Sequence, residues 1–190
     1  MDKKRILVLG GARSGKSQFA QDRAQRTANK VLFVATAEAL DDEMKQRITA
    51  HQQSRPQHWQ TLEVSRGVGK QMAKEIRDAE LVVIDCITLL MSNILTEGDI
   101  VPDQAHISVA EKLTMAEVAD IVDCMNKSSA SFIIVSNEVG LGLVPGSPLE
   151  RAYRDILGRA NQSLAKNMDE VYLLVAGIPI EIKGISKTHL

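Results

Sequence analysis

The sequence predicts an α/β fold in which helices cover both faces of a mostly parallel β-sheet. Short aliphatic, β-branched runs alternate along the chain with longer stretches of helical periodicity. Most of these runs are apolar at every position, which is typical of strands buried on both sides. The 190 residues, 44% of them hydrophobic, suffice for one full core, and we find no linker or internal repeat. We therefore expect a single domain over residues 1–190.

The elements follow in chain order from these patterns. Strands are expected at Arg5–Leu9, Val31–Ala35, Leu81–Asp85, Phe132–Ser136 and Val171–Val175. Helices are expected at about 16–28, 41–54, 67–78, 87–96, 107–127 and 149–166. A last run, Ile178–Lys183, follows the turn-forming Gly177 and predicts an edge hairpin. The polar stretch Glu97–His106 is expected to be a surface excursion between helices.

Composition excludes several classes of partner. A net charge of −1 gives no basic surface for binding a nucleic acid, and 3% aromatic residues provide no stacking surface for single strands.

No apolar run reaches the length of a membrane span, and the run after the basic N-terminus is too short for a signal peptide. Cys86 and Cys124 lack metal-ligand spacing and are expected to be buried thiols. We expect a cytoplasmic protein.

The segment Gly10-Gly11-Ala12-Arg13-Ser14-Gly15-Lys16-Ser17 fits the phosphate-loop pattern G-x-x-x-x-G-K-[ST] between a predicted strand and a predicted helix. Glycines let successive backbone N–H groups converge on phosphate oxygens, and the helix N-terminus adds its positive dipole end. Lys16 would reach the β- and γ-phosphates, and the Ser17 hydroxyl would ligate Mg²⁺. The alternative, a glycine-rich turn that binds nothing, is disfavoured by the intact Gly-Lys-Ser. The segment therefore predicts nucleoside triphosphate binding.

A second element should hold the metal opposite the loop. The run Leu81–Ile84 is apolar and ends in Asp85, as expected for a strand that delivers a metal-binding carboxylate. Alternatively, Asp85 caps the helix that starts near Ile87.

The region after the second strand contains a histidine between two arginines. On a helix over 41–54, Arg47 and His51 are neighbours four residues apart, with Arg55 at the helix exit before Pro56. Arginines neutralise phosphoryl charge and disfavour a charged imidazole, which suits a nucleophilic histidine. Spacing alone nevertheless favours an exposed helix face with a solvated histidine.

Two later segments carry polar groups. Ser136–Pro145 follows the fourth strand as a loop at its C-terminal end, where ligands sit in open α/β sheets. The stretch Arg151–Gln162 places its polar side chains on roughly one helical stripe. Its charge pattern favours a solvent-exposed face with salt bridges, although the stripe also suits a polar ligand or a subunit contact.

Taken together, these residues resemble the bifunctional adenosylcobinamide kinase/adenosylcobinamide-phosphate guanylyltransferase family of cobalamin biosynthesis. The features that carry the resemblance run in order along nearly the whole chain: Gly10–Ser17, Ala35-Thr36-Ala37, Asp42-Glu43-Met44, Arg47-Ile48, His51, Arg55-Pro56, Trp59, Asp85-Cys86-Ile87-Thr88, Asn93-Ile94-Leu95, Ser136-Asn137-Glu138-Val139-Gly140, Val144-Pro145, Arg154-Asp155, Gly158-Arg159, Asn161-Gln162 and Ala176-Gly177-Ile178-Pro179. The phosphate loop alone is shared by many NTPases, whereas the series is specific. The patch Leu89-Leu90-Met91 departs from the family, whose members often have a tryptophan there.

The resemblance implies two reactions. A kinase step phosphorylates adenosylcobinamide with ATP or GTP. A guanylyltransferase step then transfers GMP from GTP through a GMP-histidine intermediate. The resemblance therefore makes His51 a catalytic residue, as it does Lys16. The implied GTP-contacting positions are Gly10, Gly11, Ala12, Arg13, Ser14, Gly15, Lys16, Ser17, Ala35, Thr36, Ala37, Gln52, Gln53, Ser54, Arg55, Glu63 and Asp85. Without the resemblance, Glu63 is a solvated carboxylate.

The resemblance further implies a compact RecA-like phosphate-loop sheet, Mg²⁺ at Ser17 and Asp85, and a homotrimer. Two alternatives remain. Another small-molecule phosphate-loop kinase would use Lys16, Ser17 and Asp85 and leave His51 idle. A nucleotide-dependent switch is disfavoured because Asn126-Lys127 is followed by Ser128-Ser129 rather than by a guanine-selecting signature.

Overall fold

The computed structural model describes residues 3–39, 42–53, 55–96 and 103–187, and within these ranges the side chains of Glu43, Arg47, Ser186 and Lys187 are left undescribed. The strands are β1 (Arg5–Gly10), β2 (Val31–Ala35), β3 (Gln60–Glu63), β4 (Leu81–Asp85), β5 (Ser131–Val135), β6 (Glu170–Val175) and β7 (Ile178–Glu181). The helices are α1 (Lys16–Thr27), α2 (Asp42–Gln53), α3 (Val68–Glu75), α4 (Ile87–Leu95), α5 (Gln104–Lys127), α6 (Pro148–Lys166) and α7 (Ile182–Lys187).

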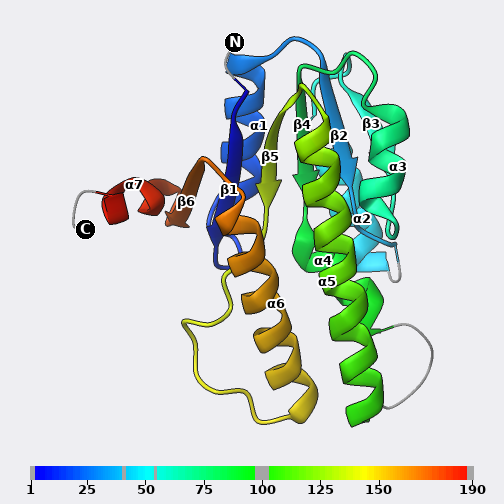
Figure 1. Ribbon diagram of the computed structural model, residues 1–190, viewed down its shortest axis with the longest axis vertical. Coiled ribbons are helices and arrows are strands. Elements are labelled where there is room, and N and C mark those ends of the chain that lie inside the picture. Colours follow the sequence, from blue (N-terminus) through cyan, green and yellow to red (C-terminus); the bar gives the residue numbers. More distant parts are fainter. Residues whose placement is uncertain (1–2, 40–41, 54, 97–102, 188–190) are drawn as a thin grey trace.

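The strands form one sheet in the order β3-β2-β4-β5-β1-β6-β7 (Figure 1). Every pairing is parallel except that of β6 with β7, which confirms the predicted α/β fold with its antiparallel C-terminal hairpin. The register sets Val135 opposite both Val8 and Asp85, so the C-terminal ends of the central strands meet at one edge. Ligands bind at this edge in open α/β sheets.

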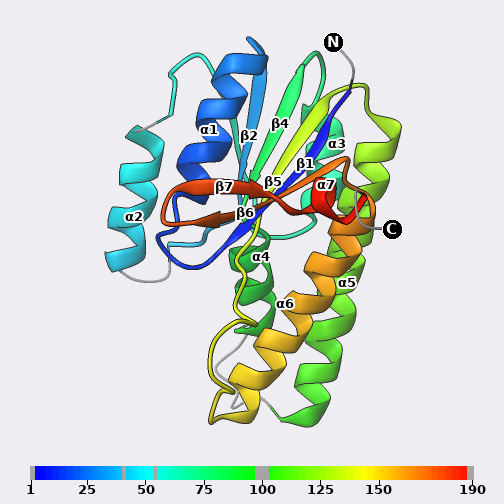
Figure 2. The same ribbon diagram turned by 90° about the vertical axis from the view of Figure 1, so that its left-hand side faces the viewer.

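Both faces of the sheet are buried, as the uniformly apolar strands predict. Leu7 and Val82 point into a core built with α3, α5 and α6, whereas their neighbours Val8 and Val83 point into a second core with Ala24 of α1. Figure 2 shows α1 and α2 on one side of the sheet and α3, α5 and α6 on the other. No helix in the described ranges is both long and apolar enough to cross a membrane.

Three elements differ from the sequence-based expectations. Strand β3 was not predicted, because Gln60-Thr61-Leu62-Glu63 is a largely exposed edge strand without an apolar pattern. The run expected as a strand to Lys183 ends at Glu181 and continues as α7. Helix α5 starts at Gln104, inside the expected excursion 97–106, because Asp103 caps it by accepting a hydrogen bond from the His106 N–H. Residues 97–102 lie outside the described part.

Candidate active site

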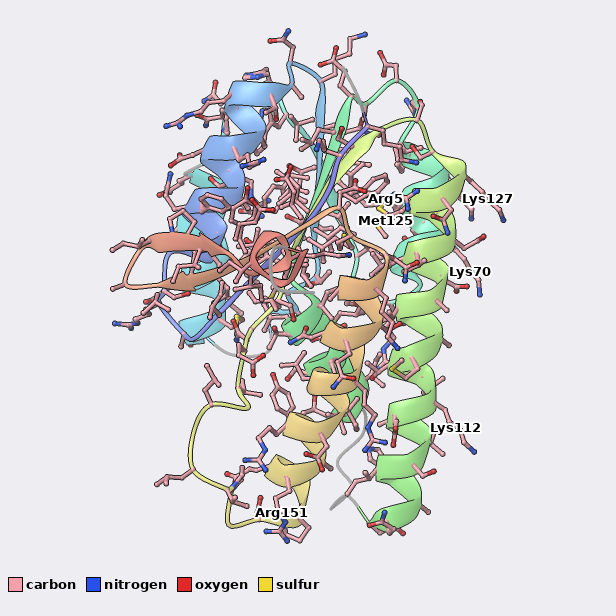
Figure 3. All side chains as sticks on the ribbon, turned by 60° about the vertical axis from the view of Figure 1, so that its left-hand side comes forward. Arg5, Lys70, Lys112, Met125, Lys127 and Arg151 are labelled. Carbon is pink, nitrogen blue, oxygen red and sulfur yellow. The ribbon has the colours of Figure 1, made fainter. Side chains whose placement is uncertain are left out.

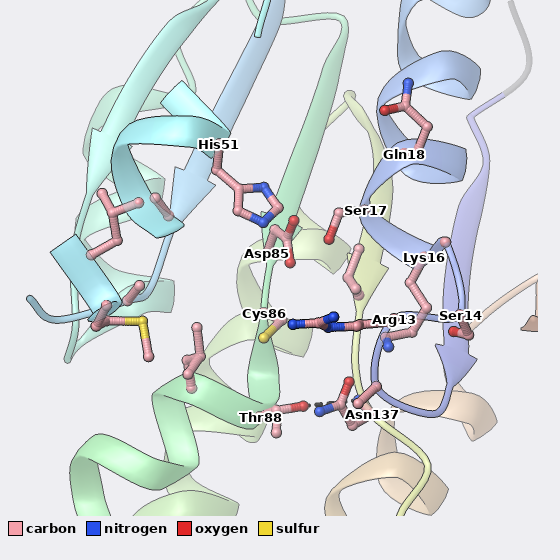
Figure 4. A pocket seen from close by; sticks show the side chains of 18 of the residues that line it. Arg13, Ser14, Lys16, Ser17, Gln18, His51, Asp85, Cys86, Thr88 and Asn137 are labelled. Carbon is pink, nitrogen blue, oxygen red and sulfur yellow. Dashed lines mark hydrogen bonds between the residues drawn. The ribbon is translucent and has the colours of Figure 1, made fainter. Parts of the chain in front are cut away.

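A cavity of about 800 Å³ opens at the C-terminal edge of the sheet, between the phosphate loop and α2 (Figure 4). Six residues of the loop, Ala12 to Ser17, line it. The remaining lining residues come from α1, β2, α2, β3, β4, α4, β5 and their flanking segments: Gln18, Ala35, Ala37, Ala39, Met44, Ile48, His51, Arg55, Glu63, Asp85, Cys86, Thr88, Leu89, Val135 and Asn137. The fold thus brings most of the predicted site residues to one place.

Two glycines set the shape of the phosphate loop. A Cβ on Gly10, whose φ is 155°, would lie 2.6 Å from both the Leu174 carbonyl oxygen and Ser14 Oγ. Gly15 has a φ of 92° and precedes α1 without any side-chain cap, so the first N–H groups of that helix are available to an anion. The turn of the C-terminal hairpin supports the loop, because the Gly177 N–H donates to the Ser14 carbonyl at 3.0 Å.

Lys16 lies folded over the phosphate loop. The residue is 8% exposed, and Nζ donates to the Gly11 carbonyl at 2.7 Å. Burial lowers the pKa of Lys16, while nearby Cys86 and Asp85 oppose that shift. A triphosphate in the cavity would offer oxygen atoms that compete with the Gly11 carbonyl for this ammonium group.

Asp85 lies at the floor of the cavity, where β4 ends. Burial raises its pKa, whereas the Ser17 hydroxyl and the charges of His51, Arg55 and Lys16 favour the carboxylate. The alternative role as a helix cap is wrong: the residue before α4 is Cys86, which makes no side-chain capping bond.

The pair formed by Ser17 and Asp85 fits a magnesium ion, which keeps several water ligands and takes the rest from phosphates and one or two protein oxygens. Within the described ranges, no group of three or more His, Cys, Asp or Glu residues could hold a metal alone. A magnesium ion held by Ser17 and Asp85 would take its remaining ligands from phosphate oxygens and water.

Thr36 shapes the cavity from behind. It is fully buried, and its hydroxyl donates to the Cys86 carbonyl at 2.6 Å and accepts the Cys86 N–H at 2.8 Å. Asn93 in turn donates from Nδ2 to the Thr36 carbonyl at 2.8 Å. Ala35 and Ala37 line the cavity, whereas Thr36 does not; instead it fixes the chain next to Asp85.

Helix α2 forms the wall opposite the phosphate loop. Met44, Ile48 and His51 line the cavity from one face of this helix, because residues three and four apart lie on the same side. Figure 4 shows the His51 ring directed toward Asp85 and Ser17. His51 is exposed, as spacing alone suggested, and it also lines the cavity.

Arg55 contributes buried cationic donors to the same wall. Its guanidinium carbon lies 3.9 Å from the centroid of the Phe33 ring. Nε and Nη1 are buried without a hydrogen-bond partner among the described residues, and burial lowers the pKa of Arg55. Buried donors of this kind favour an anionic ligand.

Some predicted contacts lie beside the cavity rather than on it. Gln52 is exposed and donates from Nε2 to Glu63 Oε1 at 2.6 Å, and only Glu63 of this pair lines the cavity. Gln53 is exposed as well, and Ser54 lies outside the described residues. Gly10 and Gly11 shape the loop without lining the cavity.

The helix α6 stripe proves mainly structural. Asn161 is turned inward and donates to the Asn137 carbonyl at 2.9 Å, while Arg151 donates to the carbonyls of Pro145 and Gly146. Arg159 pairs with Glu111 at 2.8 Å, as the predicted salt-bridged face requires. The stripe therefore holds the loop that starts at Asn137.

Sequence reasoning did not assign several cavity residues to the site. Met44 and Ile48 were quoted only as parts of motifs, although their spacing to His51 is the signal that places them on its helix face. Asn137 lay in a loop expected to be near ligands, but no spacing rule separated it from its neighbours.

Comparison with known proteins finds relatives that match nearly the whole chain. Residues 6–182 match the family described as cobinamide kinase / cobinamide phosphate guanyltransferase. The bifunctional adenosylcobalamin biosynthesis protein CobU of Escherichia coli K12 is 41% identical over 180 residues, covering 94% of this chain and 99% of that protein. The protein of the same name from Salmonella typhimurium LT2 is 39% identical with the same coverage. The bifunctional protein CobP of Pseudomonas aeruginosa is 37% identical, covering 95% and 98%.

Proposed function

Since the chain belongs to the cobinamide kinase / cobinamide phosphate guanyltransferase family, we propose that both of its reactions use the one cavity between the phosphate loop and α2. The protein is a bifunctional kinase and guanylyltransferase of adenosylcobalamin biosynthesis. The observation that carries the proposal is that Lys16, Asp85 and His51, from three different elements, line the same cavity.

In the kinase reaction, ATP or GTP lies with its phosphates in the loop. Lys16 contacts the β- and γ-phosphates, and the N-terminus of α1 supplies further N–H donors. Ser17 and Asp85 would hold Mg²⁺, which neutralises charge on the phosphates when bound. The hydroxyl of adenosylcobinamide attacks the γ-phosphorus, and a nucleoside diphosphate leaves.

In the guanylyltransferase reaction, His51 is the nucleophile. An unprotonated ring nitrogen attacks the α-phosphorus of GTP, a P–N bond forms, and the bond to pyrophosphate breaks with its electron pair on the leaving oxygen. A phosphate oxygen of adenosylcobinamide phosphate then attacks the same phosphorus and releases His51, which gives adenosylcobinamide-GDP. Arg55 is placed to stabilise phosphoryl charge in both displacements.

The proposal extends to the assembly. The family resemblance implies a homotrimer, and the exposed apolar side chains of the C-terminal hairpin offer a surface for such a contact. The partners are thus nucleoside triphosphates, the corrinoid and further copies of this chain.

The test is a covalent label on the protein. Native protein incubated with Mg²⁺ and GTP labelled at the α-phosphate should retain acid-labile label after denaturation, and His51→Ala should retain none. His58→Ala is the matched control, because His58 is exposed and does not line the cavity. Native protein that binds GTP yet stays unlabelled would contradict the histidine intermediate.

A further inference from the structure

Asn137 occupies the position that faces both the phosphate loop and Asp85. Strand β5 lies between β4, which ends at Asp85, and β1, which leads into the loop. Val135 is level with Val8 and with Asp85, so Asn137 stands two residues beyond them on the cavity side. Asn137 lines the cavity, and Figure 4 shows it beside Thr88 and near Lys16 and Arg13.

The backbone of Asn137 is anchored from two helices. Its N–H donates to Thr88 Oγ1 of α4 at 2.8 Å, and its carbonyl accepts from Asn161 Nδ2 of α6 at 2.9 Å. Thr88 is 4% exposed and Asn161 is 6% exposed, so both anchors are buried side chains.

The residues on either side of Asn137 are tied to β1. The Ser136 N–H donates to the Val8 carbonyl and the Glu138 N–H to the Gly10 carbonyl, both at 2.9 Å. The chain around Asn137 is therefore held at four points, which fixes the origin of its side chain relative to the phosphate loop.

The side chain itself has no structural hydrogen bond with any residue in the described ranges. A carboxamide offers two N–H donors and one acceptor oxygen, and it stays neutral at every pH the protein meets. Such a group can donate to a phosphoryl oxygen and at the same time accept from a hydroxyl group.

We propose that Asn137 positions the γ-phosphoryl group and the attacking hydroxyl in the kinase reaction, and that Thr88 is the positioning residue that holds Asn137 in place. This inference rests on the kinase activity of the proposed function. The bond from the hydroxyl oxygen to the γ-phosphorus forms, and the bond from that phosphorus to the bridging oxygen breaks with its electron pair on the nucleoside diphosphate. The hydroxyl proton passes to an oxygen of the transferred phosphoryl group and then to water.

The two reactions of the protein should depend on Asn137 differently. Phosphoryl transfer is governed by positioning and by stabilising charge on the γ-phosphoryl oxygens, which is the role assigned to Asn137. Guanylylation takes place at the α-phosphorus with His51 as the nucleophile from the α2 wall, so it does not need the amide. The guanylylation rate therefore serves as an internal control for folding and for nucleotide binding.

The experiment measures both reactions on the same preparations. Phosphorylation of adenosylcobinamide is followed with γ-labelled GTP, and GMP attachment to the protein with α-labelled GTP. For Asn137→Ala we expect kcat of phosphorylation to fall about 10²-fold, the loss typical of one positioned donor. The KM for GTP and the rate of GMP attachment should stay within about threefold, because a contact made mainly in the transition state changes kcat rather than ground-state binding.

Thr88 supplies a matched pair of variants. Thr88→Val has nearly the native shape but loses the hydroxyl that accepts the Asn137 N–H, so phosphorylation should fall while GMP attachment is kept. Thr88→Ser restores an acceptor and should restore phosphorylation.

Unchanged phosphorylation in Asn137→Ala, or an equal loss of both reactions, would overturn the assignment. Failure of the native protein to label adenosylcobinamide would instead refute the kinase activity itself, which separates the two claims.

Discussion

Burial shifts the pKa of several groups around the cavity toward their neutral forms. The pKa of the Cys86 thiol is raised to about 12, and that of the Tyr153 hydroxyl to about 12, in both cases mainly by loss of hydration. At neutral pH, therefore, Cys86 is a thiol rather than a reactive thiolate, although it lines the cavity. Cys86 therefore shapes the site without adding charge to it, whereas Tyr153 does not line the cavity.

The raised pKa of Tyr153 makes the stability of the protein fall as pH rises above 10. Below pH 10 the hydroxyl is protonated in both folded and unfolded chains, so it contributes no pH dependence. Between pH 10 and about 12 the unfolded chain releases the proton first, so stability falls as pH rises, by at most about 2.7 kcal/mol for two pKa units. Urea unfolding of Tyr153→Phe from pH 9 to 11 should show a shallower decline than the native protein.

An ultraviolet titration provides the control for that prediction, because Tyr153 and Tyr172 are the only tyrosines of the chain. If Tyr153 titrates near pH 10 in the folded protein, as in a free peptide, the predicted window disappears.

Single residues of the site were predictable to different degrees. The phosphate loop could be identified because its chemistry fixes residue types at fixed spacing. His51 could not be separated by spacing from a solvated histidine, since what distinguishes it is the fold that brings α2 opposite the loop. Thr36 and Asn137 depend on contacts 50 and 24 residues away along the chain, which no local pattern reveals.

At the scale of elements, one glycine sets how closely two helices approach. A Cβ on Gly69 of α3 would lie 2.4 Å from the Asp120 carbonyl carbon of α5 and 2.5 Å from its oxygen. Because the obstructing atoms belong to a helix backbone, they cannot move aside as a flexible side chain would. In contrast, a Cβ on Gly158 of α6 would meet no atom within 4 Å.

The two glycines predict opposite effects of the same substitution. Gly69→Ala should lower the free energy of unfolding by roughly 1 to 3 kcal/mol, because α3 must move away from α5. Gly158→Ala should raise it by roughly 0.5 to 1 kcal/mol, because alanine loses less backbone entropy in a helix. Urea denaturation of both variants checks this; equal effects of the same sign would contradict the close approach of α3 to α5.

The elements that sequence analysis missed are those whose stability comes from their neighbours. Strand β3 is mostly polar and pairs in parallel only with β2, next to the buried Trp59. Helix α7 is six residues long, too short for a periodic pattern. Helix α6, by contrast, carries a capping box of Ser147 and Glu150 with Pro148 at its first turn, and its start was predicted within one residue.

At the scale of the whole molecule, the C-terminal hairpin projects from the sheet (Figure 1). Its exposed apolar side chains include Val175, Ile178 and Ile180, which are 55%, 65% and 43% exposed. Figure 3 shows the hairpin and the long loop before α6 as separate parts of the surface. Val175 is paired with Ile178 across the hairpin, and exposed apolar side chains gathered in this way are typical of a contact between protein subunits.

The proposed trimer predicts that charge on the hairpin disrupts assembly. Light scattering after size-exclusion chromatography should show an oligomer for the native protein and a shift toward monomer for Ile178→Lys, because a buried unpaired ammonium group disfavours the interface. Leu143→Lys is the control, since Leu143 is 96% exposed on the other loop. A native monomer, or equal effects of both variants, would refute the hairpin as the interface.

The order of strands in the sheet was beyond sequence analysis. Alternating strands and helices predict a parallel sheet, but they do not say that β5 is inserted between β1 and β4. That insertion places Asn137 beside the phosphate loop, and no local pattern in the sequence signals it.

The hydrogen bond from the Gly177 N–H to the Ser14 carbonyl joins the hairpin turn to the phosphate loop. Where assembly through the hairpin changes this contact, assembly and occupancy of the loop are thermodynamically linked, and each changes the equilibrium constant of the other by the same factor. Affinity for a nucleotide would then depend on the concentration of the enzyme itself. A dilute solution and a crowded cell would hold the same chain in states of different ligand saturation.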